Sequence, residues 1–136
     1  MDRSSRLIVG LAALSGFLAI AAGAFGAHAI SDPTAKGWLE TGGHYQLVHA
    51  VAAIAAAILR SHGVARALLS GWLFLVGALV FSGSLYLMAA GAPLLFGAVT
   101  PIGGVLMLAG WANLGLAALD PFPFKRNRSN GKGAKP

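Results

Sequence analysis

Four long stretches without a formal charge are the feature that most restricts how this chain can fold. They cover residues 7–30, 44–59, 67–90 and 100–119. A helix needs roughly 20 apolar residues to cross about 30 Å of hydrocarbon, and only residues 44–59 fall short of that length. Charged residues make up 10% of the chain, against about 25% in soluble domains, so polar surface is too scarce for a water-soluble globule. The sequence therefore predicts an all-α membrane protein, a four-transmembrane-helix bundle formed by residues 1–124.

Lysine and arginine are distributed unevenly between the two sides of these predicted spans. If both termini lie in the cytoplasm, every one of the ten basic residues except Lys36 is on the inner side. Basic residues near the spans favour the cytoplasmic side of a membrane, and this bias sets the orientation of the whole chain. The sequence therefore predicts that both termini are cytoplasmic.

The C-terminal segment, residues 125–136, is basic and has no large apolar residue to bury. Such a composition predicts a disordered tail. We expect Lys125, Arg126 and Arg128 to bind anionic lipid headgroups at the inner surface. The net charge of +6 is then explained by the bilayer as a partner, and we expect no nucleic-acid partner.

The first span has two features of a secretory signal peptide. Arg3 and Arg6 precede the apolar run, and Ala27-His28-Ala29 has the small residues of a cleavage site. The apolar region of a signal peptide is only ~7–15 residues long, which is much shorter than residues 7–30. We therefore expect this segment to remain in the protein as a membrane span.

Polar residues within the spans are concentrated toward the predicted outer side of the bundle. They are His28, Tyr45, Gln46, His49, Ser82, Ser84, Tyr86 and Thr100. Gln46 and His49 share one helix face at i, i+3 spacing, and the alternating direction of the spans brings their outer halves together. We expect a polar cluster that joins His28, Gln46, His49 and Ser84.

Three interpretations of this cluster remain open. The first is a set of interhelical hydrogen bonds that fixes the helix register, each worth about 0.6 kcal/mol on average in a membrane. The second is a pocket for a small molecule or a lipid. The third is a metal or haem site at His28 and His49, although two histidines without a carboxylate or thiolate make a poor zinc site. We expect no bound cofactor.

Groups that could carry out catalysis are scarce. The chain has no cysteine, which excludes thiolate metal sites and cysteine nucleophiles. All four acidic residues lie at or beyond the ends of the predicted spans. Ser82 and Ser84 therefore lack the acid that would complete a nucleophile, base and orienting group, and we expect no enzymatic activity.

Four motifs follow one another along the spans. They are Gly23-Ala-Phe-Gly-Ala-His28-Ala29, Trp38 with Tyr45-Gln46-x-x-His49-Ala50, Phe81-Ser82-Gly83-Ser84-Leu85-Tyr86, and Thr100-Pro101-Ile102-Gly103-Gly104 followed by Gly110-Trp111. In this order the chain resembles domain-of-unknown-function family 423, over about residues 10 to 111. The resemblance implies a four-span protein of the bacterial inner membrane. The family has no established activity, so the resemblance supplies no catalytic residue.

Small size, the lack of a soluble domain and helix faces rich in glycine and alanine favour one function. We expect a non-catalytic accessory or assembly subunit of a larger membrane complex, or a self-associating protein. Glycines that would allow close packing of the third and fourth spans are Gly77, Gly83, Gly103, Gly104 and Gly110. The alternatives are a small-molecule or lipid binder or minor transporter that uses the region around His28 and His49, and a haem- or metal-binding membrane protein.

Overall fold

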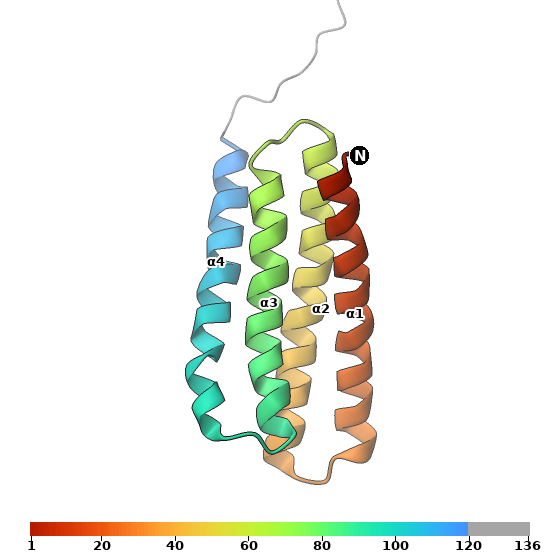
Figure 1. Cartoon of the computed structure of the whole chain (residues 1–136), viewed down its shortest axis with the longest axis vertical. Coiled ribbons are helices and arrows are strands. Elements are labelled where there is room, and N and C mark those ends of the chain that lie inside the picture. The colour runs from red at the N-terminus through yellow and green to blue at the C-terminus, as the bar shows by residue number, and fades with distance from the viewer. Residues whose placement is uncertain (120–136) are drawn as a thin grey trace, which may run out of the picture.

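The structure, a computed structural model, describes residues 1–119 and is helical throughout its regular elements (Figure 1). The elements are α1 (Arg3–Ala29), α2 (Pro33–Ser61), α3 (Ala67–Ala89), the 3-10 helix η1 (Leu94–Ala98) and α4 (Thr100–Ala117). Four helical segments are long and apolar enough to cross a membrane, the fourth comprising η1 and α4. The prediction of an all-α four-span fold is confirmed. The predicted lipid-binding residues Lys125, Arg126 and Arg128 lie outside the described residues.

The second span differs from its prediction at the N-terminal end. The second uncharged stretch begins at residue 44, but α2 begins at Pro33. The Asp32 side chain accepts a hydrogen bond from the Ala35 amide at 2.7 Å, and proline is favoured at the first helical position. The helix therefore starts at an N-cap and carries Lys36 within its first turns.

The early start of α2 changes the expected depth of its polar residues. At 1.5 Å per residue, the 29 residues of α2 extend for about 43 Å, which exceeds the ~30 Å hydrocarbon core. In a span that begins at residue 44, Gln46 and His49 would lie in the first turns. They lie instead near the middle of α2, about 20 Å from either end, and so near the centre of the bilayer.

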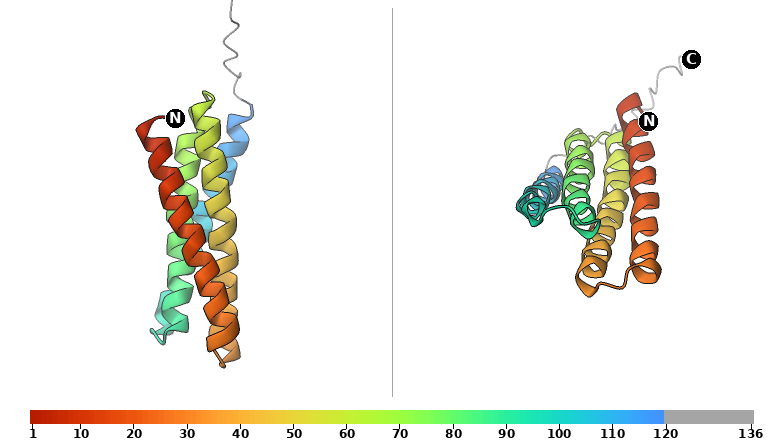
Figure 2. Two further views of the ribbon diagram at one scale, coloured as in Figure 1. Left: turned by 90° about the vertical axis from the view of Figure 1, so that its right-hand side faces the viewer. Right: turned by 60° about the horizontal axis from the view of Figure 1, so that its bottom comes forward.

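The four spans form an open row rather than a closed bundle (Figures 1 and 2). α2 packs against α1 and α3, while α4 packs mainly against α3. α1 also contacts α3 near the point where both helices begin, through Ile8 and Gly71. In each of the two outer spans, only 17% of the most apolar 18-residue stretch is buried, against 50% in α2 and 44% in α3. The two central helices are therefore the core of the molecule, and the outer two are largely exposed.

Glycines bring the backbones of α3 and α4 into direct contact. A Cβ atom added to Gly103 would lie 2.4 Å from the Phe81 backbone nitrogen and 2.6 Å from the Gly77 carbonyl oxygen. Gly110 similarly makes room for the ring of Phe74. The prediction of close packing through Gly77, Gly103 and Gly110 is confirmed. It is wrong for Gly83 and Gly104, where an added Cβ would meet no atom within 4 Å.

Polar contacts connect the helices on the side of the molecule where α1 and α3 begin and where α2 and α4 end. Asp2 caps α1 by accepting a hydrogen bond from the Ser5 amide at 2.7 Å, and its carboxylate lies 3.6 Å from the Arg60 guanidinium. The hydrogen bond from Ser5 is the main cause, with Arg60 adding to it, of a pKa of Asp2 below the ordinary 3.8. Asn113 of α4 donates to the Arg66 carbonyl at 3.0 Å.

Candidate functional site

The two polar residues near the centre of α2 face opposite sides of the helix row. Gln46 and His49 are both buried, with 4% and 5% of their surface exposed. Gln46 borders a groove between α1 and α3, whereas His49 borders a hollow beside α4. The two residues thus belong to two separate polar centres, although the sequence predicts one.

The first centre is a pair formed by Gln46 and Tyr86. The Tyr86 hydroxyl donates a 2.7 Å hydrogen bond to Gln46 Oε1. Tyr86 fits there because Gly42 has no side chain: an added Cβ would lie 2.7 Å from the tyrosine ring. The amide nitrogen, Gln46 Nε2, has no hydrogen-bond partner within residues 1–119.

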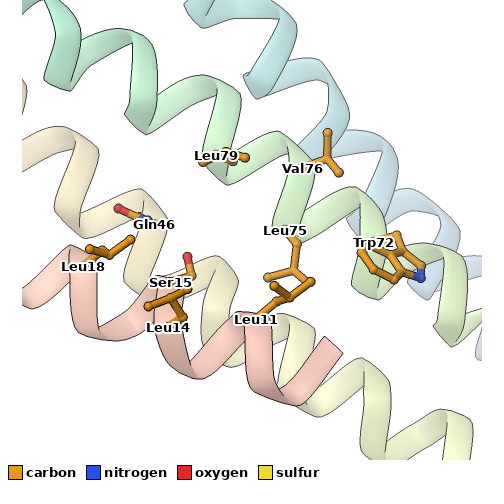
Figure 3. Close-up of a pocket in the computed structure, with 9 residues that line it drawn as sticks. All are labelled: Leu11, Leu14, Ser15, Leu18, Gln46, Trp72, Leu75, Val76 and Leu79. Carbon is orange, nitrogen blue, oxygen red and sulfur yellow. The ribbon is translucent and has the colours of Figure 1, made fainter. Parts of the chain in front are cut away.

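An apolar groove runs along this face of the molecule, and we call it the α1/α3 groove (Figure 3). Its walls are mainly Leu11, Leu14 and Leu18 of α1 and Leu75, Val76 and Leu79 of α3. The part beside these residues has a volume of about 260 Å³, and a second part of about 410 Å³ continues past Gln46 to Phe25 and Tyr86. Gln46 borders both parts, and Ser15 borders the first.

The second centre is formed by His49 and Trp111. His49 Nδ1 lies 2.8 Å from the Tyr45 carbonyl oxygen of the preceding turn, and Trp111 Nε1 donates to His49 Nε2 at 3.2 Å. The Tyr45 ring stacks against the imidazole with centroids 6.2 Å apart. A hollow of about 340 Å³ lies beside these three residues and α4. Both ring nitrogens of His49 therefore have partners.

The remaining polar residues form short links between helices. Ser82 donates to the Gly42 carbonyl of α2 at 2.7 Å, and Ser84 donates to the Phe81 carbonyl at the same distance. Thr100 lies 2.7 Å from Ser84 and joins the start of α4 to α3. The bond from Ser84 to Phe81 lies within α3, whereas the contacts of Ser82 with Gly42 and of Thr100 with Ser84 join two helices, as interhelical hydrogen bonds that fix register do.

His28 lies apart from both centres. It is exposed near the end of α1, and no hydrogen bond from it to another described residue is present. A Cβ added to the nearby Gly26 would lie 3.0 Å from Leu39, and Leu39 precedes His49 by about 15 Å along α2. His28 and His49 therefore cannot bind the same ion. The expected cluster of His28, Gln46, His49 and Ser84 was wrong as a single site.

Sequence reasoning missed two contributors to these centres. Trp111 enters the sequence analysis only as part of a motif, yet it is 47% exposed and donates to His49. Ser15 was not considered, although its hydroxyl has no hydrogen-bond partner among the residues described. A signal for both was available, because each is a hydrogen-bond donor in the middle of an apolar span.

Known proteins similar to this chain are named as membrane proteins. Residues 22–104 match the family described as "Protein of unknown function (DUF423)". A "UPF0382 membrane protein" of Haemophilus influenzae is 46% identical over 109 residues, covering 76% of this chain and 86% of the relative. The "UPF0382 inner membrane protein YgdD" of Escherichia coli K12 is 39% identical over 120 residues, covering 85% and 92%. The "UPF0382 membrane protein YwdK" of Bacillus subtilis is 33% identical over 119 residues, covering 84% and 97%. No solved structure matches.

Proposed function

This chain belongs to the DUF423 family of membrane proteins, and from its structure we propose that it is a non-catalytic accessory subunit. It packs the outward face of α4 against another membrane protein. The observation that carries this proposal is the open helix row, because an open row leaves an entire face of each outer helix without a protein neighbour.

The outward face of α4 suits a helix partner better than the outward face of α1 does. One side of α4 carries exposed residues at three- and four-residue spacing, namely Val105, Ala109, Ala112 and Leu116. In lipid, helices associate through close packing of small residues rather than through burial from water. Two alanines at the centre of this face permit such an approach, whereas the exposed residue at the centre of α1 is the bulky Phe17.

The chemistry of the buried polar groups supports a non-catalytic role. Ser82 and Ser84 both donate to backbone carbonyl oxygens, so neither hydroxyl is paired with a base. His49 has partners at both nitrogens. Within residues 1–119, no three histidine or acidic side chains are gathered as a metal site requires.

Purification from native membranes in mild detergent tests the proposal. We expect the wild-type chain to migrate in a larger assembly, and the double variant Ala109→Phe/Ala112→Phe to migrate alone. Both positions are exposed, so the added rings displace lipid or partner rather than core side chains. Ala13→Phe, at an exposed position of α1, is the matched control and should leave the assembly intact. A wild-type chain that always migrates alone would contradict the accessory role.

We further propose that both termini face the cytoplasm. Four arginines lie where α1 and α3 begin and α2 ends, namely Arg3, Arg6, Arg60 and Arg66, whereas Lys36 lies where α2 begins, at the opposite ends of the helices. This charge distribution favours a cytoplasmic location of both termini. Because the chain has no cysteine, single cysteines can report it. A membrane-impermeant maleimide should label Ser31→Cys in intact cells and label His62→Cys only after permeabilisation; the reverse pattern would show the opposite orientation.

A further inference from the structure

We propose that the α1/α3 groove binds a neutral lipid whose head carries a carbonyl group within the hydrocarbon region, as the head of a prenylated quinone does. This inference is independent of the accessory role, because the groove and the outward face of α4 are on different helices.

The shape of the groove suits an elongated apolar molecule. Its two parts have volumes of about 260 Å³ and 410 Å³, close to or within the range of small-molecule sites, about 300–1,000 Å³. From Leu11 to Phe25 the lining of α1 extends for about 20 Å. The walls are nearly all apolar, so they would hold a hydrocarbon chain.

The groove contains a hydrogen-bond donor that no protein group satisfies. Gln46 Oε1 accepts a hydrogen bond from Tyr86, and within residues 1–119 no group accepts one from Nε2. Among side-chain atoms sealed from the surroundings within residues 1–119, only Ser5 Oγ lacks a partner, so Gln46 Nε2 opens into the groove. A buried amide without a partner is costly in an apolar medium. A ligand oxygen that accepts from Nε2 removes that cost.

The depth of Gln46 selects the class of ligand. Gln46 lies near the bilayer centre, and the hydrocarbon core extends about 15 Å to either side of it. The ester oxygens of phospholipids lie outside this core and cannot reach Gln46. A lipid with an uncharged carbonyl head can enter the core, because it carries an acceptor without the cost of burying a charge.

Two neighbouring residues would shape recognition of such a head. Ser15 is half-buried on the α1 side of the same groove, and its hydroxyl supplies a second unpaired donor (Figure 3). Tyr86 acts as a positioning residue, because its bond to Oε1 fixes which side of the amide faces the groove. Two donors match a ring that carries two carbonyl acceptors.

The groove also contains a built-in reporter of binding. Trp72 lines it, and the chain has three tryptophans. Replacing Trp38 and Trp111 by phenylalanine leaves Trp72 as the one source of tryptophan fluorescence. A decyl-substituted benzoquinone quenches this fluorescence on close approach, and phosphatidylcholine with brominated acyl chains does so when ordinary lipid occupies the groove. The two probes distinguish a carbonyl ligand from an acyl chain.

In phosphatidylcholine vesicles, we expect quenching by the quinone to saturate. Gln46→Leu should raise the half-saturating quinone concentration about tenfold, and Ser15→Ala about threefold, as expected for the loss of one hydrogen bond. Ser84→Ala, which removes a hydroxyl outside the groove, should leave it unchanged. Without quinone, brominated phosphatidylcholine should quench Trp72 equally in the parent and in Gln46→Leu, because an acyl chain in the groove accepts no hydrogen bond from Gln46.

Two results would overturn the proposal. Quenching that rises linearly with quinone and is identical in Gln46→Leu would show that the quinone only partitions into the bilayer. Saturation that brominated phosphatidylcholine abolishes would show that an ordinary acyl chain fills the groove. Val76→Phe tests the site should Gln46→Leu fail to fold: position 76 is 44% exposed, so the ring narrows the groove without disturbing the core. Unchanged binding in this variant would also contradict the site.

Discussion

The imidazole of His49 is held in one tautomer by its two partners. A carbonyl oxygen can only accept, so the 2.8 Å contact with Tyr45 places a proton on Nδ1. Trp111 Nε1 can only donate, so Nε2 must accept. Both ring nitrogens are therefore engaged, and Nε2 has no free lone pair for a metal while Trp111 donates to it. Histidine is the most adaptable acid–base group in proteins, yet here it is used as a link between α2 and α4.

Trp111→Phe tests the value of this link. The substitution keeps an aromatic ring beside Phe74, whose centroid is 4.9 Å from that of Trp111, and removes only the donor to His49. We expect the free energy of unfolding in mixed micelles to fall by about 1 kcal/mol, within the range for hydrogen bonds in membrane proteins. Trp38→Phe is the matched control and should cost less.

A double-mutant cycle separates the hydrogen bond from ring packing. In a His49→Leu background, Trp111→Phe should have little further effect, because the acceptor is already gone. An equal loss of stability in both backgrounds would assign the contribution to the shape of Trp111 rather than to its N–H group.

The sequence predicted which residues are polar in the bilayer but not which of them meet. Gln46 and His49 share a face by i, i+3 spacing, yet they are far enough apart around α2 to contact different helices. Which partner each one meets depends on where α1 and α4 pack, and glycine positions decide that. The pairing of Tyr86 with Gln46, for example, requires the missing side chain of Gly42.

The contact between α3 and α4 depends on Gly103 more than on any polar group. An added Cβ would meet backbone atoms of Phe81 and Gly77, and backbone atoms cannot rotate away as a flexible side chain can. Gly103→Ala should therefore push α4 from α3 and lower the free energy of unfolding by about 2 kcal/mol or more. Gly104→Ala is the neighbouring control.

An added Cβ at Gly104 meets no atom within 4 Å, and alanine is the better helix former. We therefore expect Gly104→Ala to leave stability unchanged or slightly raised. Thermal unfolding of the two variants in the same detergent compares them directly. Equal destabilisation of the two variants would contradict the assignment of the loss to the contact between α3 and α4.

The sequence predicted the number and type of helices, because a long uncharged stretch in lipid must satisfy its own backbone hydrogen bonds, and a helix does so within one segment. It failed at the start of α2, because the charged residues Lys36 and Glu40 lie outside the uncharged stretch of residues 44–59. A helix that extends beyond the hydrocarbon core can carry charges in its outer turns. Asp32-Pro33 was the signal to heed, since this pair supplies both the N-cap and the first helical residue.

The open row gives the molecule two faces with different chemistry. The α1/α3 groove presents an unpaired amide, whereas the hollow beside α4 presents a histidine whose nitrogens are both engaged. A closed bundle would bury Gln46 and His49 together in one core. The separation of the two centres, and with it both proposals above, therefore depends on α1 and α4 lying at opposite ends of the row.

Engineered disulfides test this arrangement directly, because the chain has no cysteine of its own. A Cβ added at Gly16 would lie 4.0 Å from the Ala50 Cβ, within the 3.5–4.5 Å that a disulfide requires. Gly16→Cys/Ala50→Cys should therefore cross-link α1 to α2 on mild oxidation. Gly16→Cys/Leu108→Cys, at similar depth on α1 and α4, should form no bond within one chain. An intramolecular disulfide in that second pair would show that the bundle closes, while a cross-linked dimer would instead report self-association through the outer helices.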